Sequence, residues 1–385
     1  MGLVLLNRHR QRDYAVAPPS PAARGLHRDL PGYGETPLRC LPDTARRLGL
    51  AEVSIKDESS RLGLPAYKVL GAAWATWRVL QRRFGEELTE WCSLEDLRRR
   101  LAGSPLRLVT ATDGNHGRGV ARVARWLGLE AEVYVPSGTA ESRILGIASE
   151  GARVVEVDGT YDQAVERAAA VRGENVLQIQ DHGWPGYEEI PQWVAEGYET
   201  IFAETDEQLA SLGRGAPHLV LVQIGVGTLA SAAVRHWRRA GLAHRPVLVG
   251  VEPTGAACAL RSIEAGHPVL IDAGAHSSIM AGLNCGTPSS AAWPDLLAGI
   301  DAFVAVEDER ARTAMRELAG AGIVAGESGA AGLAGLAELM APEHEPTRAS
   351  LGVGRETRVL LISTEGATDP AAYEQIVGRR VRSEQ

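Results

Sequence analysis

Short apolar segments alternate with helical segments along most of the chain, and this alternation restricts the possible folds more than any other feature. Strands are predicted at 106–110, 131–135, 153–157, 176–179, 218–223, 247–251 and 358–362, with helices at 118–127, 141–150, 162–172, 191–204, 229–240, 307–318 and 328–339. Parallel strands need a crossover connection, which a helix supplies. The pattern therefore predicts an α/β fold with largely parallel sheets covered by helices.

The N-terminal part departs from this alternation. Residues 1 to about 35 are predicted as an extended arm, because Pro18, Pro19 and Pro21 mark irregular structure. A short helix at 44–50 and a strand at 53–56 are predicted to follow.

Composition limits the class of protein. A formal net charge of -8, from 40 Lys and Arg against 48 Asp and Glu, argues against a general nucleic-acid binder. The four cysteines form no CxxC pair and the ten histidines form no HxxxH motif, so no metal site is predicted. No segment is long enough to cross a membrane. We expect reduced thiols and a cytoplasmic protein.

A loop with glycine and proline at 60–71 (SRLGLPAYKVLG) delivers Lys68 to the start of a predicted helix. Apolar residues then recur at helical spacing at Ala73, Trp77 and Leu80. A helix N-terminus disfavours cations, so we expect the pKa of Lys68 to be lowered and its amine to be free, as a Schiff-base lysine requires. The alternative is an ordinary solvated lysine.

Four loops follow predicted strands, and ligands of open α/β sheets bind beyond the carboxyl ends of the strands. The first loop, 112–117, combines glycines with the first amides of a helix and so suits an anion. Within it Asn115 offers a donor and an acceptor, and Asp113 offers a base. Either residue could instead only cap the helix.

The second loop, 224–230 (IGVGTLA), offers backbone amides, the hydroxyl of Thr228 and a helix N-terminus, as a phosphate cradle does. It also fits the GxGxxA fingerprint of dinucleotide-binding proteins, with Glu252 where a ribose-binding acid would lie. A nicotinamide enzyme is therefore a competing hypothesis. Tight packing of strand on helix is a third explanation of the glycines.

The third and fourth loops each contain one polar residue that could take part in catalysis or ligand binding. Asp181 lies just past a strand end, where it could be an acid or base, although a turn aspartate is the simpler reading. Ser363 follows a buried strand, where it could hydrogen-bond a ring nitrogen or cap a helix.

Several motifs occur in the order seen in fold-type II pyridoxal-phosphate enzymes, the tryptophan-synthase-β-like family, and the chain resembles this family from about residue 30 onward. The motifs are RLGL at 61–64 with Tyr67-Lys68, ATDGNHGRGVA at 111–121, Gln180-Asp181, MAGLNCG at 280–286, GESGA at 326–330 and STEG at 363–366. Asp113 makes the resemblance closest to the lyases that remove ammonia from 2,3-diaminopropionate. Two departures are Ile224, where the family often has a longer glycine run, and Tyr67, where phenylalanine is common.

The resemblance implies a pyridoxal 5'-phosphate cofactor and a role for each candidate. Lys68 would hold the cofactor covalently, Asn115 would contact its phenolic oxygen and Ser363 its pyridine nitrogen. The phosphate would bind to Gly225, Val226, Gly227 and Thr228, and the substrate carboxylate to Thr112, Gly114 and His116.

The implied reaction is α,β-elimination of ammonia from 2,3-diaminopropionate (D, L or both), giving aminoacrylate and then pyruvate and a second ammonia. Lys68 and Asp113 would be bases on opposite faces of Cα, and Asp181 or Lys68 would protonate the departing nitrogen. The resemblance also implies two three-layer α/β domains, 1–74 with 179–385 and 75–178, and a homodimer.

Other functions stay open from the sequence. A dehydratase or β-substitution enzyme for a serine- or threonine-like amino acid would use the same cofactor, but the pair Asp113 and Asp181 favours an amine substrate. A nicotinamide oxidoreductase leaves Lys68 unexplained, and a non-catalytic binding protein leaves Lys68 and both aspartates unexplained. We expect a small amino-acid substrate and neither a nucleic-acid nor a membrane partner.

Overall fold

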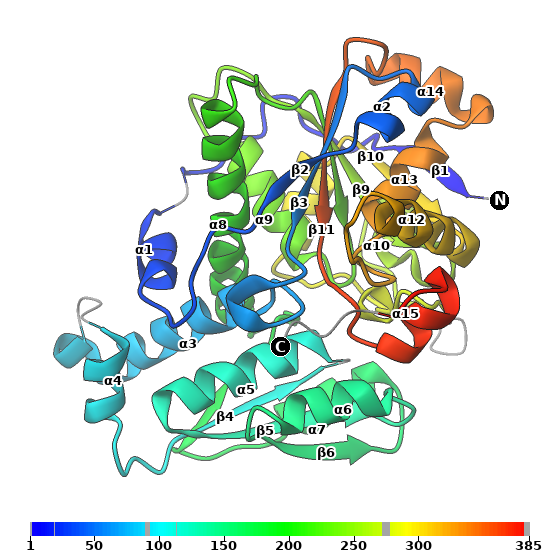
Figure 1. Cartoon of the computed structure of the whole chain (residues 1–385). Coiled ribbons are helices and arrows are strands. Elements are labelled where there is room, and N and C mark those ends of the chain that lie inside the picture. Colours follow the sequence, from blue (N-terminus) through cyan, green and yellow to red (C-terminus); the bar gives the residue numbers. More distant parts are fainter. Residues whose placement is uncertain (1, 19, 89–92, 113, 272–277, 381–385) are drawn as a thin grey trace.

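The computed structural model describes residues 2–18, 20–88, 93–112, 114–271 and 278–380. Its strands form two sheets, and the smaller sheet lies below the larger one in Figure 1. The order of the larger sheet is β1 (Leu3–Leu6), β10 (Ala302–Val306), β9 (Val247–Pro253), β8 (Leu219–Gln223), β11 (Arg358–Ser363), β3 (Glu52–Asp57) and β2 (Leu38–Cys40). The order of the smaller sheet is β6 (Arg153–Val157), β5 (Glu130–Pro136), β4 (Arg107–Ala111) and β7 (Val176–Gln178).

Strand directions confirm the predicted α/β class. Among the described strands, β1 runs antiparallel to β10 and β2 antiparallel to β3, both at sheet edges, and the remaining pairs are parallel. The helices are α1 (Ala22–Arg28), α2 (Pro42–Leu48), α3 (Val69–Phe84), α4 (Leu94–Arg100), α5 (Asn115–Leu127), α6 (Glu141–Ala148), α7 (Tyr161–Ala169), α8 (Glu189–Ser211), α9 (Thr228–Trp237), α10 (Cys258–Ala265), α11 (Trp293–Gly299), α12 (Asp308–Gly320), α13 (Ala331–Leu339), α14 (Glu345–Ser350) and α15 (Pro370–Val377).

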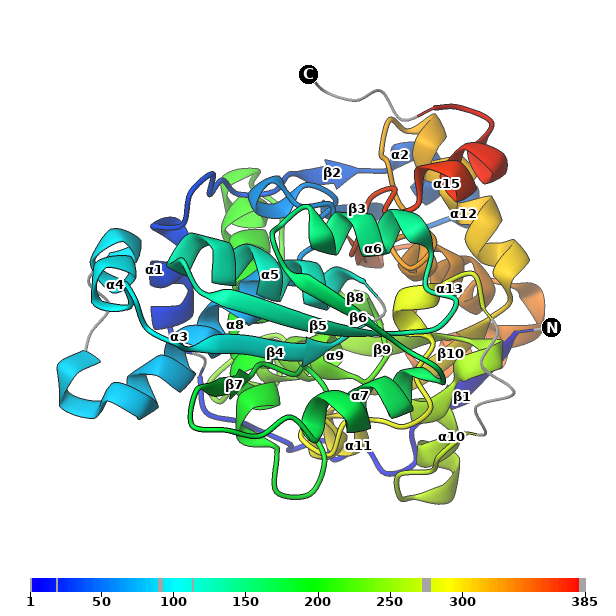
Figure 2. The same cartoon turned by 90° about the horizontal axis from the view of Figure 1, so that it is seen from below.

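Each sheet is packed between helices, as parallel sheets require. In the larger sheet, Val220 of β8 packs in the apolar core on the side of α8 and α9. The next residue, Leu221, packs in the apolar core on the opposite side, with α12 and α13. In the smaller sheet, β4 turns Leu108 toward α5 and Val109 toward α7, and Figure 2 shows these helices on opposite sides of the strands. Because successive side chains of a strand point to opposite faces, each sheet has an apolar layer on both of its faces.

The predicted N-terminal arm was wrong in part, because it contains β1 and α1. β1 adds an edge strand whose partner, β10, lies about 300 residues later, so no local signal marks it. The strands at 107–178 form the smaller sheet and those before and after it form the larger one. That distribution is consistent with the predicted domain boundaries, which stay a prediction.

Helix α3, which begins directly after Lys68, is held closely against α8. A Cβ on Gly71 would lie 2.5 Å from a ring carbon of Tyr198 and 2.8 Å from the Val194 carbonyl oxygen. Any side chain at Gly71 would therefore push the helices apart and displace the segment that carries Lys68.

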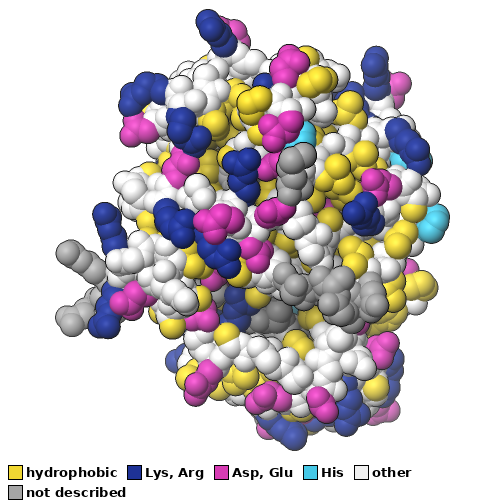
Figure 3. All heavy atoms as spheres, turned by 90° about the vertical axis from the view of Figure 1, so that its right-hand side faces the viewer, with side chains coloured by type: hydrophobic (Ala, Val, Ile, Leu, Met, Phe, Trp, Pro, Cys, Tyr) yellow, Lys and Arg dark blue, Asp and Glu magenta, His cyan; other side chains and the backbone are white. Residues whose placement is uncertain are grey.

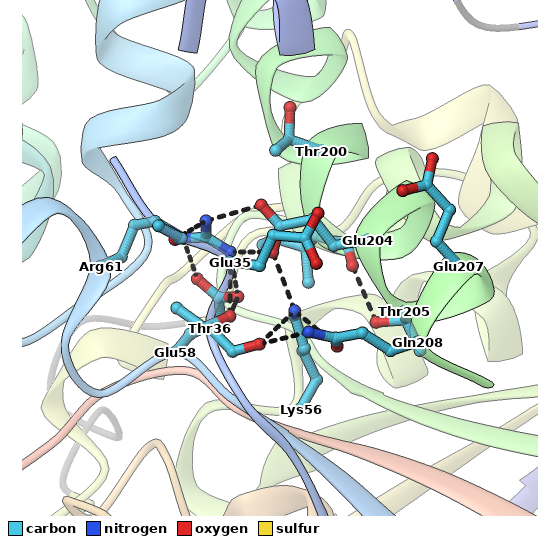
Figure 4. A network of polar contacts seen from close by, with 12 residues as sticks. Glu35, Thr36, Lys56, Glu58, Arg61, Thr200, Glu204, Thr205, Glu207 and Gln208 are labelled. Atoms are coloured by element: carbon cyan, nitrogen blue, oxygen red, sulfur yellow. Dashed lines mark hydrogen bonds and ion pairs between the residues drawn. The ribbon is translucent and has the colours of Figure 1, made fainter. Parts of the chain in front are cut away.

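A buried cluster of charges includes Arg61 from the loop that precedes Lys68 (Figure 4). Glu204 of α8 accepts hydrogen bonds from Lys56 Nζ at 2.8 Å and from Arg61 Nη2 at 2.7 Å, and Arg61 also contacts Glu58 at 2.6 Å. All four side chains are 0% exposed. Buried charges need this pairing, so the cluster fixes the loop to the larger sheet.

Glu204→Gln is expected to lower the free energy of unfolding by about 3–5 kcal/mol, because it leaves Lys56 and Arg61 incompletely paired. Although burial favours the neutral acid, Arg61 and Lys56 lower the pKa of Glu204 from 4.5 to about 2. The stability from its ionised form is thus complete above about pH 4.5 and is lost as the pH falls toward 2.

Urea unfolding at several pH values measures this effect. The matched control is Glu207→Gln, on the same helix but with an exposed ion pair to Arg24, which should change stability by less than about 1 kcal/mol. Two results would contradict the role given to Glu204. One is an equal loss of unfolding free energy in the two variants, and the other is a decline of stability at acidic pH in Glu204→Gln that matches the wild type.

Candidate active site

A cavity lies where strand ends from both sheets meet the N-termini of α3, α5 and α9. Its lining includes nine residues named from the sequence: Lys68, Thr112, Asn115, His116, Asp181, Gly225, Val226, Gly227 and Thr228. It also includes residues not assigned a role there: Tyr67, Tyr161, Gln223, Leu229, Gly282, Leu283, Cys285, Ser328, Thr364 and Glu365. Asp113 lies outside the described residues.

Lys68 and Asp181 form an ion pair at the centre of this cavity. Lys68 Nζ donates to Asp181 Oδ2 at 2.7 Å, and Asp181 is 4% exposed. The rings of Tyr67 and Tyr198 flank the amine, with centroids 5.7 and 6.0 Å from Nζ. Tyr198 comes from α8, which is distant in sequence, so no local motif signals it.

The sequence contains only two lysines, Lys56 and Lys68. Lys56 Nζ donates to Thr36 O, Glu204 Oε2 and Gln208 Oε1, at 2.7, 2.8 and 3.0 Å, which uses all three of its N–H groups. Of the two lysines, Lys68 is therefore the one whose amine can react with a ligand.

The predicted lowering of the Lys68 pKa was wrong. Burial opposes the charge of Lys68, but the carboxylate of Asp181, helped by Tyr198 and Tyr67, raises its pKa well above the ordinary value. Burial likewise opposes the charge of Asp181, and the ammonium of Lys68 nonetheless holds the pKa of Asp181 well below its usual range. The carboxylate of Asp181, in contact with Lys68 at 2.7 Å, therefore has a larger effect on the pKa of Lys68 than the field of the helix N-terminus.

His116 lies on the other side of Asp181 from Lys68. Its Nε2 lies 2.8 Å from the carbonyl oxygen of Ile179, so Nε2 carries the hydrogen and Nδ1 is left facing Asp181 Oδ2 at 3.7 Å. Burial lowers the pKa of His116, so the ring is neutral. The Nδ1 atom is buried and has no hydrogen-bond partner among the described residues.

The loop before α5 holds its candidates in different ways. Gly114, with φ at 149°, takes the N-cap position, and its amide donates to Thr112 Oγ1 at 2.9 Å. Asn115 does not cap the helix, because its Nδ2 donates to the Glu365 carboxylate. Thr112, Asn115 and His116 line the cavity, whereas Gly114 does not.

The glycine loop presents the start of α9 to the cavity. Thr228 begins the helix after the N-cap residue Gly227, and no side-chain cap hydrogen bond forms there within the described part of the chain. The first amides of a helix lack intrahelical partners and favour an anion. The hydroxyl of Thr228 donates to the carbonyl oxygen of Asp181 at 2.7 Å. This hydrogen bond connects the glycine loop to the segment that carries the Lys68–Asp181 ion pair.

Ser363 ends β11 directly before Thr364 and Glu365, which line the cavity. It is 0% exposed, and its Oγ has no hydrogen-bond partner among the described residues. It therefore does not cap a helix. A buried hydroxyl without a partner fits a ligand atom such as a ring nitrogen.

The acid expected of a nicotinamide enzyme is already engaged elsewhere. Glu252 accepts from the amides of Ala259 and Leu260, both at 2.8 Å, at the start of α10. It is 0% exposed, and burial raises its pKa to about 8. Glu252 therefore caps α10 and offers no exposed carboxylate to a ribose.

An open cleft of roughly 770 Å³ adjoins the cavity and shares Tyr161 with it. Its walls include Arg143 from beside the smaller sheet and Arg316 and Asp369 from beside the larger one.

The surface of the molecule carries charges of both signs, which Figure 3 shows interspersed on one face. Among the described helices, none is long and apolar enough to span a membrane.

Comparison with known proteins gives consistent matches. A family model described as pyridoxal-phosphate-dependent enzyme matches residues 30–354. The diaminopropionate ammonia-lyase of Salmonella typhimurium is 38% identical over 372 residues, which cover 91% of this chain and 90% of that protein.

Two crystal structures of the Escherichia coli diaminopropionate ammonia-lyase are also similar to this chain. The complex with D-serine has a TM-score of 0.88 and 34% identity, and covers 98% of this chain and 97% of that one. The complex with an aminoacrylate-PLP azomethine reaction intermediate has a TM-score of 0.87 and 33% identity, with the same coverage of both chains.

Proposed function

This chain belongs to the family of pyridoxal-phosphate-dependent enzymes, and we propose that within it the chain is a carbon–nitrogen lyase that removes ammonia from 2,3-diaminopropionate. Its cofactor is pyridoxal 5'-phosphate. The observation that carries the proposal is the placement of Lys68, the lysine with a reactive amine, in one cavity with the N-terminus of α9, which has no side-chain cap among the described residues.

The described residues fit this cofactor. Lys68 would bind its aldehyde carbon, and the amides of 225–228 its phosphate. The unpartnered Oγ of Ser363 would face the pyridine nitrogen, and Asn115 the phenolic oxygen. When bound, the cofactor withdraws electrons from Cα of the amino acid and so acidifies the Cα–H bond.

The protein's own groups then move the protons. Lys68 and Asp113 would remove the Cα proton, each from one face. As the Cα–Cβ double bond forms, the Cβ–N bond breaks, its electron pair stays on nitrogen, and ammonia leaves once that nitrogen is protonated. Lys68 Nζ, which lies 2.7 Å from Asp181 Oδ2, would donate this proton. Where Lys68 is the base, its neutral amine would pass on the proton that it took from Cα, and where Asp113 is the base, Lys68 would start in its protonated form. The amides at the start of α5, including that of His116, and the hydroxyl of Thr112 would bind the substrate carboxylate.

Ammonia and pyruvate release from 2,3-diaminopropionate, serine and threonine tests the function. We expect the largest kcat/KM with 2,3-diaminopropionate. A larger value with serine or threonine would favour the alternative, a dehydratase with the same cofactor.

Asp113→Asn is expected to lower kcat for one enantiomer of 2,3-diaminopropionate by roughly 10²–10⁴-fold, as loss of a general base does. The other enantiomer should be affected much less, because Lys68 would serve its face of Cα. Separate assays of the D and L substrates measure the difference, and equal losses would contradict the two-base assignment.

Gly225→Ala is expected to weaken cofactor binding about tenfold, which corresponds to roughly 1.4 kcal/mol. The new Cβ would lie 3.0 Å from Gly282 O and 3.2 Å from Cys285 Sγ, so these neighbours would have to shift slightly. Titration of the apoenzyme measures the affinity. Gly25→Ala, at a site with nothing within 4 Å, is the matched control and should bind the cofactor normally.

We further propose that the enzyme is a cytoplasmic homodimer. Family likeness supports the dimer, and cysteine usage supports the compartment. A mass of twice 41.0 kDa in analytical ultracentrifugation would support the dimer, and a mass of 41.0 kDa would contradict it.

A further inference from the structure

Two of the sequence motifs, GESGA at 326–330 and STEG at 363–366, are only partly used by the mechanism above. They meet at Glu365, a cavity-lining carboxylate that is 1% exposed. We propose that Glu365 is a positioning residue that holds the side-chain amide of Asn115 in the orientation needed by the cofactor. This inference rests on the cofactor assignment made above, but not on the identity of the substrate.

The Glu365 carboxylate accepts hydrogen bonds from two different segments. Oε2 accepts from Asn115 Nδ2, in the first turn of α5 beside the smaller sheet. Oε1 accepts from the amide of Ser328 at 3.2 Å, in the GESGA segment beside the larger sheet. Each donor meets its own acceptor oxygen, whereas a glutamine here would turn an NH₂ group toward one of the two donors.

The backbone of Glu365 is itself closely confined. Its carbonyl oxygen accepts from the Gly326 amide at 3.0 Å, and a Cβ on Gly329 would lie 2.3 Å from the same oxygen. The residue also forms an isolated bridge with Ala66, and the Gly366 amide donates to Pro65 O at 2.9 Å. Glu365 is thus attached to the loop that carries Lys68, so its carboxylate has a defined position relative to that amine.

This arrangement fixes how Asn115 faces the cavity. The amide nitrogen of Asn115 carries two N–H groups, and Glu365 accepts one of them. A carboxylate cannot face the amide oxygen without repulsion, so the amide cannot flip. The second N–H group is left for the cofactor's phenolic oxygen, the contact proposed for Asn115.

The test measures cofactor affinity by titrating apoenzyme with pyridoxal 5'-phosphate, without substrate. We expect Glu365→Gln and Glu365→Asp each to weaken affinity about tenfold and to shift the visible absorption band of the bound cofactor. Glu365→Asp keeps the charge but withdraws the carboxylate by one methylene, so it serves if Glu365→Gln does not fold. Glu327→Gln, at an acid of the GESGA segment that is also buried (4% exposed), is the matched control and should bind within twofold of wild type.

Coupling to Asn115 separates positioning from a general structural effect. If Glu365 acts through Asn115, the double variant Asn115→Ala with Glu365→Gln loses no more affinity than Asn115→Ala alone, within twofold. Wild-type affinity in both Glu365 variants, or losses that multiply in the double variant, would overturn the inference. Since no substrate is present, neither result depends on whether 2,3-diaminopropionate is the substrate.

Discussion

Replacing Lys68 by alanine is expected to abolish covalent attachment of pyridoxal phosphate and to lower the rate of ammonia release by roughly 10²–10⁴-fold or more. The substitution removes both the amine that binds the aldehyde carbon and the base proposed for one face of Cα. Lys56 cannot replace it, because all three of its N–H groups are engaged in a cluster that is 0% exposed.

The presence of only two lysines makes this prediction sharp. Reduction of the holoenzyme with borohydride, followed by peptide mass spectrometry, should place one pyridoxyl group on Lys68 in the wild type and none on any lysine in Lys68→Ala. The thermal unfolding midpoint of the apoenzyme reports whether the variant is folded. An adduct on Lys56, or full activity without Lys68, would contradict the assignment of the cavity.

Replacing Asp181 by asparagine is expected to lower kcat by roughly 10²–10³-fold, because Lys68 loses the carboxylate that keeps its proton in place. The same substitution should make attachment of the cofactor easier at low pH, although it lowers kcat. Asp181 raises the pKa of Lys68, so its removal lowers that pKa. Attachment requires the neutral amine, and its rate should therefore reach its plateau at a lower pH in Asp181→Asn than in the wild type.

Stopped-flow mixing of apoenzyme with pyridoxal phosphate over a pH series measures the attachment rate. Asp162→Asn, in the first turn of α7 and outside the cavity lining, is the matched control and should follow the wild-type profile. A plateau that stays in place, or moves to higher pH in Asp181→Asn, would show that the ion pair does not control the Lys68 amine.

Much of the fold could be predicted because its signals are local. The apolar strands with the helices between them identified the parallel α/β class, and Gly49 and Gly128 marked helix ends, both in left-handed conformation at C-caps. The β1 edge strand and α1 were missed, since a short strand such as Leu3–Leu6 is stabilised by its partner β10 rather than by its own sequence.

Most of the candidate site was also predicted, since ligand-binding residues of this fold follow strand ends and helix starts. The protonation of Lys68 was not, because its pKa depends on Asp181, which lies 113 residues away in the sequence. Glu365 appeared in a motif but without a role, because its partners Asn115 and Ser328 come from two other segments.

The sequence by itself determined the strand and helix order, the lysine at a helix start and the glycine loop, all of which depend on neighbours a few residues apart. Only the tertiary structure decided which charged and polar groups meet: Lys68 with Asp181, Asn115 with Glu365, and Arg61 with Glu204. The physical reason is that electrostatic and hydrogen-bond energies depend on distances in space and on burial, and folding brings together groups whose separation in the chain carries no such information.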